Sequence, residues 1–454
     1  MEKKRILFIC LIIFIITFCY DYFISYLNLD EIWNYGFSYN ISCGLVPYRD
    51  FNMLQMPLFF FIGSMFIKVF GNHLWSVHIF NSILIASMML IIIKKIGIKG
   101  LILYPVILIY AFYSYNTFCL LLGLLMLGSL DKDSKYSDYF IAFIISLIFL
   151  SKQNIGICLF VPMIYYSKNK IKSFIVFLIP NLVLLIYLII NNCLYDFINY
   201  TFLGMFDFGK SNGIYHFVLF YVMLVFYLVY KLIKSKFKDK YIFYILAFQV
   251  VGFPIIDDYH FMVGFILFLY YILLVKDISK RYYKYIFIVS ISFFFIYLVD
   301  TDIKMLDYDL FHIRLYSNKD SFLYGRNFSM KSQKLLNDLS NYVYNSRDVY
   351  GDNVYVFSNW AYLIKLNMGE NPGIYDFILD GNMGYKGEEK IISSISDTCS
   401  DNKCLFVVQC GGNQLSFNIV KYVVTNYKKI GVIEDIDHYT YIKKKANYLI
   451  YTND

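Results

Sequence analysis

Hydrophobic residues run in long stretches through the first two thirds of the chain, separated by short polar or basic segments. The first stretch extends from Ile6 to about Leu27 and follows a basic start, Lys3-Lys4-Arg5. A secretory signal holds only about 7–15 apolar residues and ends at a small-residue cleavage site, which this stretch does not match. We therefore expect a retained first helix with its basic end in the cytoplasm.

Ten further apolar stretches follow at short intervals. They cover residues 74–93, 101–113, 117–130, 139–150, 155–166, 173–190, 214–230, 241–256, 261–275 and 285–298. Several are shorter than the roughly 20 residues that cross a bilayer, so their ends are approximate. Together with the first stretch they predict about 11 transmembrane helices.

The stretch 57–70 is also apolar but holds only 14 residues, so we expect an interfacial or re-entrant helix on the outer side. Basic loops begin at Lys94, Lys132, Lys168, Lys231 and Lys276. The positive-inside rule places all of them in the cytoplasm if 57–70 does not cross, and all of them outside if it does. The pattern therefore favours a cytoplasmic N-terminus and an extracytoplasmic C-terminus.

The composition becomes more polar at about Asp300, after which no apolar run is long enough to span a membrane. Residues 353–357 and 404–408 have the pattern of buried strands. Residues 390–396 and 415–426 have the pattern of amphipathic helices. These elements predict a small α/β domain of about 130 residues.

Composition agrees with this division. The 454 residues are 59% hydrophobic and 16% charged, whereas soluble chains average about 25% charged residues. The net charge is +8, but the lysines lie between apolar stretches, which indicates a lipid bilayer and not nucleic acid as the partner. We predict a mainly α polytopic protein of the cytoplasmic membrane, with a membrane-embedded domain at 1–300 and an extracytoplasmic α/β domain at 301–454.

The nine cysteines show no metal-binding spacing, because no C-x-x-C or Cys/His group occurs. Most of them lie in apolar stretches as small hydrophobic residues. Cys399, Cys404 and Cys410 fall in the polar tail. A Cys399–Cys404 disulfide is compatible with a tail in an oxidising compartment, and the sequence leaves that pairing open.

Two adjacent carboxylates, Asp30 and Glu31, directly follow the first apolar stretch. Charges so close to lipid are expensive, so we favour a functional site over the alternative, a solvated acidic pair. The segment Gly44–Phe51 and then Pro57-Leu58 complete an outward loop at 28–57.

This order of motifs resembles the GT-C superfamily of integral membrane glycosyltransferases, which includes the protein O-mannosyltransferases and the aminoarabinose transferases. The resemblance covers about residues 1–300. It departs at Gln55, which stands where such enzymes often carry a basic residue.

The resemblance implies transfer of a sugar, with inversion, from a polyprenyl-phosphate carrier to an outer-face acceptor in the cell envelope. It makes Asp30 the base that deprotonates the acceptor. Glu31 would orient the acceptor or raise the pKa of its neighbour. Arg49 and Lys152 are candidates for binding the carrier phosphate. The alternative for Lys152 is a lysine that snorkels from a helix end.

Two further polar groups lie between apolar stretches: Ser151–Asn154, which contains Lys152, and Asp257-Asp258-Tyr259-His260. The second group would bind a divalent metal, or place His260 on the phosphate and its acids on sugar hydroxyls, or form a solvated turn. Hydrogen bonding to the substrates is assigned to Tyr48, Asp50, Gln153, Asn154, Asp257 and Asp258. His73 and His78, on either side of Trp75, are expected to be packing or interface residues.

Two other functions remain as alternatives. A polysaccharide polymerase or lipid-linked-glycan ligase would share the outward polar loops but need not carry an acidic pair after the first span. A transporter of lipid-linked glycans would show inverted repeats and charges near the midplane. The charges of this chain gather at one face, which favours the transferase.

Overall fold

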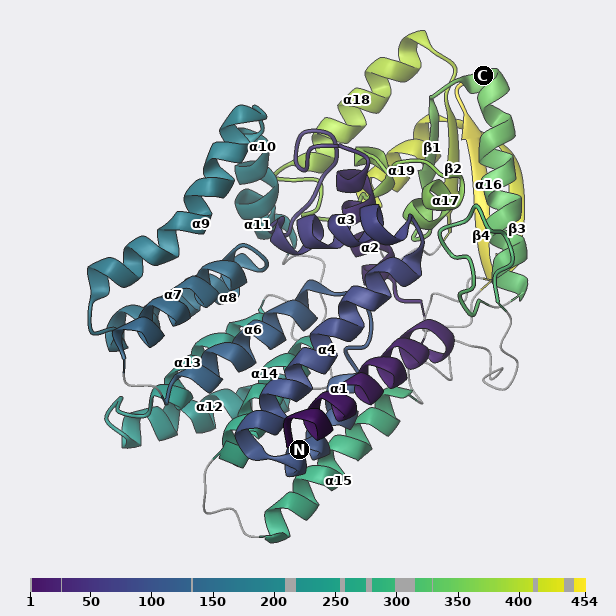
Figure 1. Ribbon diagram of the computed structural model, residues 1–454. Coiled ribbons are helices and arrows are strands. Elements are labelled where there is room, and N and C mark those ends of the chain that lie inside the picture. Colours follow the sequence, from purple (N-terminus) through teal and green to yellow (C-terminus); the bar gives the residue numbers. More distant parts are fainter. Residues whose placement is uncertain are drawn as a thin grey trace.

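The computed structural model describes residues 2–25, 27–131, 134–208, 218–253, 258–274, 280–298, 315–328, 330–410, 415–436 and 445–454. Helices make up its N-terminal part, and a four-stranded sheet with flanking helices makes up its C-terminal part (Figure 1). Asp257 of the predicted acid and histidine group lies outside the described residues.

The N-terminal part is a bundle of consecutive helices. They are α1 (Glu2–Cys19), η1 (Tyr20–Ile24), α2 (Leu29–Ser42), α3 (Leu58–Phe70), α4 (Leu74–Ile96), η2 (Ile98–Leu103), α5 (Tyr104–Leu108), α6 (Tyr115–Ser129), α7 (Lys135–Phe149), α8 (Gln153–Tyr166), α9 (Lys170–Ile190), α10 (Leu194–Ile198), η3 (Asn199–Leu203), α11 (Met205–Phe208), α12 (Val218–Lys234), α13 (Lys240–Phe248), η4 (Gln249–Gly252), α14 (Asp258–Leu274) and α15 (Lys280–Tyr297). Ser114 and Ser134 cap α6 and α7, accepting hydrogen bonds from first-turn N–H groups. Every predicted apolar stretch overlaps at least one of these helices.

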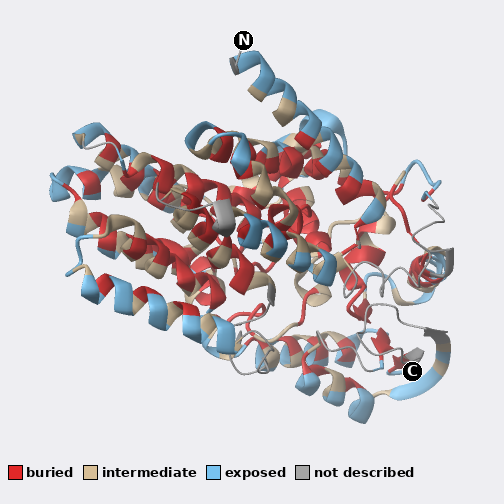
Figure 2. Cartoon of the chain, turned by 90° about the horizontal axis from the view of Figure 1, so that it is seen from below, coloured by how far each residue is buried: buried red, intermediate tan, exposed pale blue. Residues whose placement is uncertain are grey.

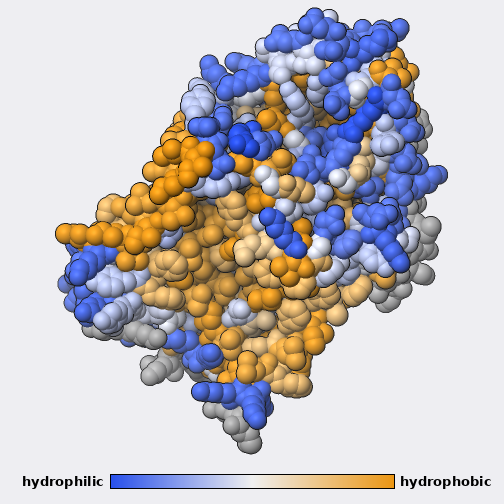
Figure 3. All heavy atoms as spheres, turned by 45° about the horizontal axis from the view of Figure 1, so that its top comes forward, coloured by the Kyte–Doolittle hydropathy of each residue, from blue (hydrophilic) through white to orange (hydrophobic). Residues whose placement is uncertain are grey.

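The bundle has the surface of a membrane protein. Within the described residues, Lys3–Ile24, Leu74–Ile96 and Lys170–Ile190 are long and apolar enough to cross a membrane, and shorter apolar helices accompany them. Apolar atoms cover the middle of the molecule in Figure 3, while hydrophilic atoms gather over the C-terminal part and at the opposite tips. The chain is therefore a multi-pass membrane protein.

The predicted outward loop at 28–57 is helical in its first half. The helix α2 begins after Asn28, whose side-chain oxygen accepts a hydrogen bond of 2.8 Å from the Asp30 N–H. Ile32, Tyr35 and Phe37 are buried along it. Their apolar side chains alternate with asparagine and serine, so the sequence pattern did not distinguish this helix from a loop. The helix predicted at 57–70 is α3.

The C-terminal sheet has the strand order β1-β2-β4-β3. Its elements are α16 (Met330–Tyr350), β1 (Val354–Phe357), α17 (Ala361–Asn367), η6 (Ile374–Asp376), α18 (Gly387–Asp401), β2 (Leu405–Gln409), α19 (Phe417–Asn426), β3 (Lys428–Ile436) and β4 (Lys445–Thr452). The strands β1 and β2 pair in parallel, and the other two pairs are antiparallel. The predicted strands are confirmed as β1 and β2, and the predicted helices as α18 and α19.

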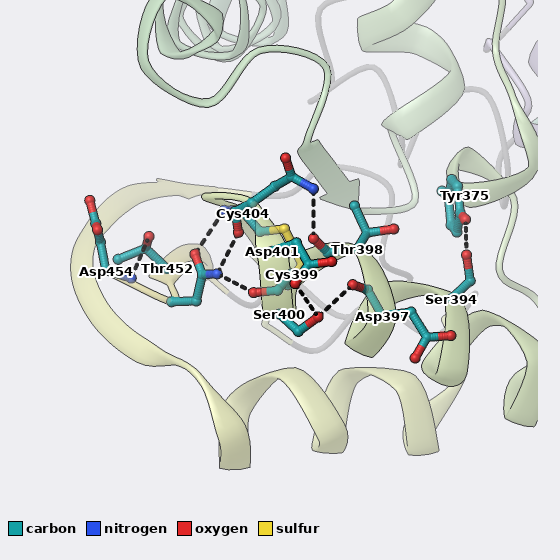
Figure 4. The surroundings of a disulfide bond; sticks show 12 residues. Tyr375, Ser394, Asp397, Thr398, Cys399, Ser400, Asp401, Cys404, Thr452 and Asp454 are labelled. Carbon is teal, nitrogen blue, oxygen red and sulfur yellow. Dashed lines mark hydrogen bonds between the residues drawn. A yellow bond between two sulfur atoms is a disulfide. The ribbon is translucent and has the colours of Figure 1, made fainter.

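A disulfide joins Cys399, in the last turn of α18, to Cys404, directly before β2 (Figure 4). The Asn453 side chain closes the same turn, because its amide donates to the carbonyls of Cys399 at 2.6 Å and Asn402 at 2.7 Å. The pairing that the sequence left open is therefore present. Disulfides persist mainly in oxidising compartments, which agrees with an extracytoplasmic position.

The C-terminal part packs directly on α2 and the loop that follows it. The Asn52 amide donates to the carbonyls of Phe377 at 2.9 Å and Asn382 at 3.0 Å. Gly36 allows the Tyr362 ring to approach α2, since an added Cβ would lie 2.5 Å from a ring carbon. One hydrophobic core includes residues of both parts, and buried residues fill the interior of the bundle in Figure 2.

Candidate functional site

The start of α2 turns its two acidic side chains in different directions. Asp30 is exposed, whereas the Glu31 side chain is fully buried. Successive residues of an α-helix are about 100° apart, so neighbouring carboxylates need not share an environment. The N–H groups of a first helical turn also stabilise negative charge. Of these two carboxylates, Asp30 is the one that solvent reaches.

Glu31 belongs to a buried charge cluster, which we define as Asp21, Glu31, His78 and Arg326. His78 Nδ1 lies 2.9 Å from Asp21 Oδ2, and His78 Nε2 lies 3.1 Å from Glu31 Oε1. Arg326 Nη2 lies 3.7 Å from Glu31 Oε2. An ionised carboxylate only accepts hydrogen bonds, so a doubly protonated imidazole is the form that suits both neighbours. With His78 in this form and both carboxylates ionised, two negative and two positive charges balance in a site that is closed to solvent.

The surroundings of Glu31 keep it ionised. Burial alone would raise its pKa, but His78, Arg326 and a hydrogen bond of 3.1 Å from the Tyr113 N–H together lower the pKa below its ordinary value. Glu31 is thus an acceptor for neighbouring donors inside the protein. Asp30 precedes it in the same helical turn, and its side chain is exposed.

Asp21, Glu31 and His78 have the donor types of a metal site, and their ligand atoms lie within 4.8 Å of one another. Their arrangement fits a divalent ion poorly. Each imidazole nitrogen already faces a carboxylate, and Arg326 supplies a second positive charge. A divalent cation would add uncompensated positive charge to a buried site, which is strongly unfavourable.

The sequence predicts a packing or interface role for His78 and gives no role to Asp21 or Arg326. A signal existed for Asp21, because an ionisable residue inside an apolar stretch is itself a functional-site hypothesis. No local signal exists for Arg326, whose guanidinium donates to a carbonyl 305 positions earlier, that of Asp21. The structure brings these residues together from α4, the end of the first helix and the segment 315–328.

Lys152 lies directly before α8, and its ammonium group points into the protein. Its Nζ donates to Asn116 Oδ1 at 3.1 Å and to the Val251 carbonyl at 3.2 Å. The same Nζ lies 5.5 Å from the centre of the Tyr115 ring. A snorkelling lysine extends its charge into water. The inward contacts of Lys152 differ from that behaviour.

The two amides that follow Lys152 bind backbone carbonyls. Gln153 Nε2 donates to the carbonyl of Thr201 at 3.0 Å, and Asn154 Nδ2 donates to that of Phe253 at 2.8 Å. The polar string 151–154 therefore ties the start of α8 to η3 and to the residue after η4.

Tyr48, Arg49 and Asp50 form a compact turn in the loop after α2. Tyr48 is buried, and its hydroxyl donates to the Gln55 carbonyl at 2.8 Å. Arg49 binds Asp50 through Nε and Nη2, at 2.8 and 3.0 Å. The Arg49 guanidinium holds the pKa of Asp50 below its ordinary value, which makes that carboxylate a weaker base.

Tyr259 and Tyr115 lie in the same region as Asp30 and Lys152. Asp30 lies within electrostatic range of Tyr259, and Tyr259 within that of Tyr115. The Tyr115 ring in turn lies below the Lys152 ammonium group. His260 neighbours this row, with its ring 5.6 Å from that of Tyr259. Asp258 begins α14, and its side chain lies outside the description.

Arg49 lies in a different place, within electrostatic range of Cys193 and Tyr187 near the end of α9. The structure thus brings Asp30, Lys152 and His260 towards one another around Tyr259 and Tyr115.

No protein-family model and no curated protein matches the sequence. The structure matches two solved structures of ArnT from Cupriavidus metallidurans, one bound to undecaprenyl phosphate and one in the apo state. In both cases the TM-score is 0.56 and the sequence identity is 9%, and the match covers 100% of this chain and 98% of the other. ArnT is an aminoarabinose transferase of the GT-C superfamily. The ArnT-like fold expected from the sequence resemblance is confirmed, and the count of about 11 spans stays a prediction.

Proposed function

We propose that the chain is an inverting glycosyltransferase that moves a sugar from a polyprenyl-phosphate carrier to an acceptor at the outer face of the cytoplasmic membrane. One observation carries the proposal: an accessible Asp30 stands beside a buried, ionised Glu31 at the start of α2. The fold shared with ArnT supports it, and one ArnT structure holds undecaprenyl phosphate.

In this reaction the acceptor oxygen forms a bond to the anomeric carbon while the bond from that carbon to the phosphate oxygen breaks. Asp30 takes the proton of the acceptor hydroxyl, and the electron pair of the broken bond leaves with the lipid phosphate. Asp30 suits the role better than Asp50, because Arg49 occupies both oxygens of Asp50. Asp30 is also exposed, so an acceptor can reach it.

The leaving phosphate needs positive charge, which Lys152 supplies. Asn116, Val251 and Tyr115 hold the ammonium group on the row of side chains that leads from Asp30. His260 lies beside the same row and is a second phosphate contact. Arg49 contacts the carrier from the loop after α2.

The other predicted residues act around these groups. Gln153 and Asn154 hold the neighbouring backbone segments in place, because their amides bind carbonyls. Tyr48 and Asp50 keep the loop after α2 folded and present Arg49. Asp257 and Asp258 keep the role that the sequence gives them, contact with sugar hydroxyls.

The test compares the wild type with Asp30→Asn on a panel of radiolabelled polyprenyl-phosphate sugars. Asparagine keeps the size of the side chain but cannot take the proton, so turnover should fall about 100-fold or more. Donor binding should change little. The matched control is Asp397→Asn, which makes the same change at an exposed position of α18. Near-normal turnover in Asp30→Asn would assign the base to another residue, and no transfer by the wild type from any donor would refute the proposal.

A further inference from the structure

Arg326 reaches the membrane bundle from the segment 315–328, which joins the last helix of the bundle to the C-terminal part. Its side chain is fully buried. Its guanidinium donates to the carbonyl of Asp21 and, at 2.9 Å, to that of Ser25. These carbonyls belong to the C-terminal end of the first helix, where unpaired acceptors and partial negative charge favour a cation.

Neighbouring contacts hold the same segment against the bundle. Asn327 Nδ2 donates to the Phe23 carbonyl at 2.9 Å. The N–H of Leu74, the first residue of α4, donates to the Phe322 carbonyl at 2.8 Å. The segment thus lies between the end of the first helix and the start of α4, the two elements that carry Asp21 and His78. Only a docked segment places Arg326 in the buried charge cluster.

The position of Arg326 affects α2 because its charge is part of the balance around Glu31. Without Arg326, the cluster holds two carboxylates and one imidazolium, which leaves one buried negative charge uncompensated. Removing one partner of a buried ion pair is strongly destabilising for that reason. Arg326 Nη2 lies 3.7 Å from Oε2 of Glu31, which belongs to the first turn of α2.

We propose that Arg326 is a positioning residue for Asp30. By completing the buried charge cluster it fixes Glu31, and Glu31 fixes the helical turn that presents Asp30 to the acceptor. The orientation of the base therefore depends on the docking of the C-terminal part. The inference rests on the proposed function for the role of Asp30, but the contact it requires is independent of any reaction.

The first measurement is hydrogen exchange of the purified full chain in detergent. Arg326→Met should raise the exchange rate of amides 31–33 in α2 about 10-fold or more, while β2 amides stay protected. Arg347→Met is the matched control, because it breaks the Arg347–Glu370 ion pair without touching α2. Unchanged exchange at 31–33, or equal loss of protection in β2, would overturn the proposal.

The double variant Glu31→Gln with Arg326→Met removes one charge of each sign and leaves the Asp21–His78 pair balanced. It should protect amides 31–33 better than Arg326→Met alone, whereas a merely space-filling arginine would show no such rescue. Arg326→Lys keeps the charge but offers no planar fork, so it should give intermediate exchange. If Arg326→Met does not accumulate, Arg326→Lys is measured in its place.

The second measurement is turnover. A displaced base slows the chemical step, so kcat should fall about 10- to 100-fold in Arg326→Met while the donor KM stays within about 2-fold. An equal change in both constants would contradict positioning. If the wild type transfers no sugar, the proposed function fails while the exchange result still decides whether Arg326 fixes the turn.

Discussion

At the scale of single residues, the contacts of Lys152 distinguish two roles, binding the carrier phosphate and anchoring a helix end. Its Nζ is held by Asn116 and Val251 and lies over the Tyr115 ring, all inside the protein. A lysine that only anchors a helix end at the membrane surface extends its charge into water and not into the protein. A lysine that meets a lipid phosphate gains from being held in place before the phosphate arrives.

We expect Lys152→Met to lose a charge-assisted hydrogen bond worth about 1.5–3 kcal/mol, or about 10- to 150-fold in donor affinity. Lys152→Arg should recover only part of this, because the guanidinium has a different reach and shape. Titrating a polyprenyl-phosphate sugar against both variants measures the effect. The control is Lys68→Met, at an exposed lysine of α3. Unchanged donor affinity in Lys152→Met would remove the phosphate role.

The site residues that the sequence identified are those with local signals. Asp30 and Glu31 stand together after an apolar stretch, and Lys152 interrupts two others, so each is conspicuous where it lies. Arg326 is an arginine in a polar segment, and only folding places it beside Glu31. The sequence also could not predict the different environments of Asp30 and Glu31, because they depend on which side of α2 meets α4.

At the scale of elements, prediction followed apolar content. The strands β1, at one edge of the sheet, and β2, in its interior, are continuous apolar runs and were predicted. The strand β3, at the opposite edge of the sheet, begins with Lys428-Lys429 and was not predicted. Edge strands commonly carry such charges, which weakens their pattern. Within the part of the chain that the structure describes, the helix α2 was also not predicted, because asparagine and serine interrupt its apolar pattern.

The disulfide joins two elements, the end of α18 and the start of β2. Its cysteines are 5 positions apart, and closing so short a loop stabilises the folded state by about 2 kcal/mol in the chain-entropy model. We expect Cys399→Ser with Cys404→Ser to lower the opening free energy of β2 amides by about that amount, measured by hydrogen exchange. Cys410→Ser, at a free exposed cysteine, is the control and should change nothing. An unchanged opening free energy in the double variant would contradict this role.

At the scale of the whole molecule, the predicted inner loops that begin at Lys94, Lys132, Lys168 and Lys231 meet one another, while residues 276–279 of the fifth lie outside the described residues. Lys95 Nζ lies 3.3 Å from Asp131 Oδ2, which joins the loops after α4 and α6. The Lys168 N–H donates to Asp138 at 2.9 Å, which joins the start of α7 to the loop after α8. The Tyr166 hydroxyl donates to the carbonyl of Phe237, after α12, at 2.7 Å. Loops that touch must lie on the same side of a membrane.

The predicted outer loops meet in the same way. Gln153 joins the loop before α8 to η3, and Asn154 joins it to the residue after η4. Asn52 joins the loop after α2 to the C-terminal part. The count of about 11 spans remains a prediction, and it requires these two sets of loops to lie on opposite sides of the membrane. We expect the lysines of the first set to mark the cytoplasmic side and the disulfide of the C-terminal part to mark the outer side.

This arrangement predicts opposite accessibility for two lysine positions. Lys238, in the loop before α13, and Lys390, in α18, are both exposed, so a cysteine at either site can react if the reagent reaches it. In a background with Cys19, Cys43 and Cys410 changed to serine, a membrane-impermeant maleimide added to intact cells should label Lys390→Cys. It should label Lys238→Cys only after the inner face is opened. Labelling of both from the same side would place the C-terminal part with the basic loops, and Asp30 would then face the cytoplasm.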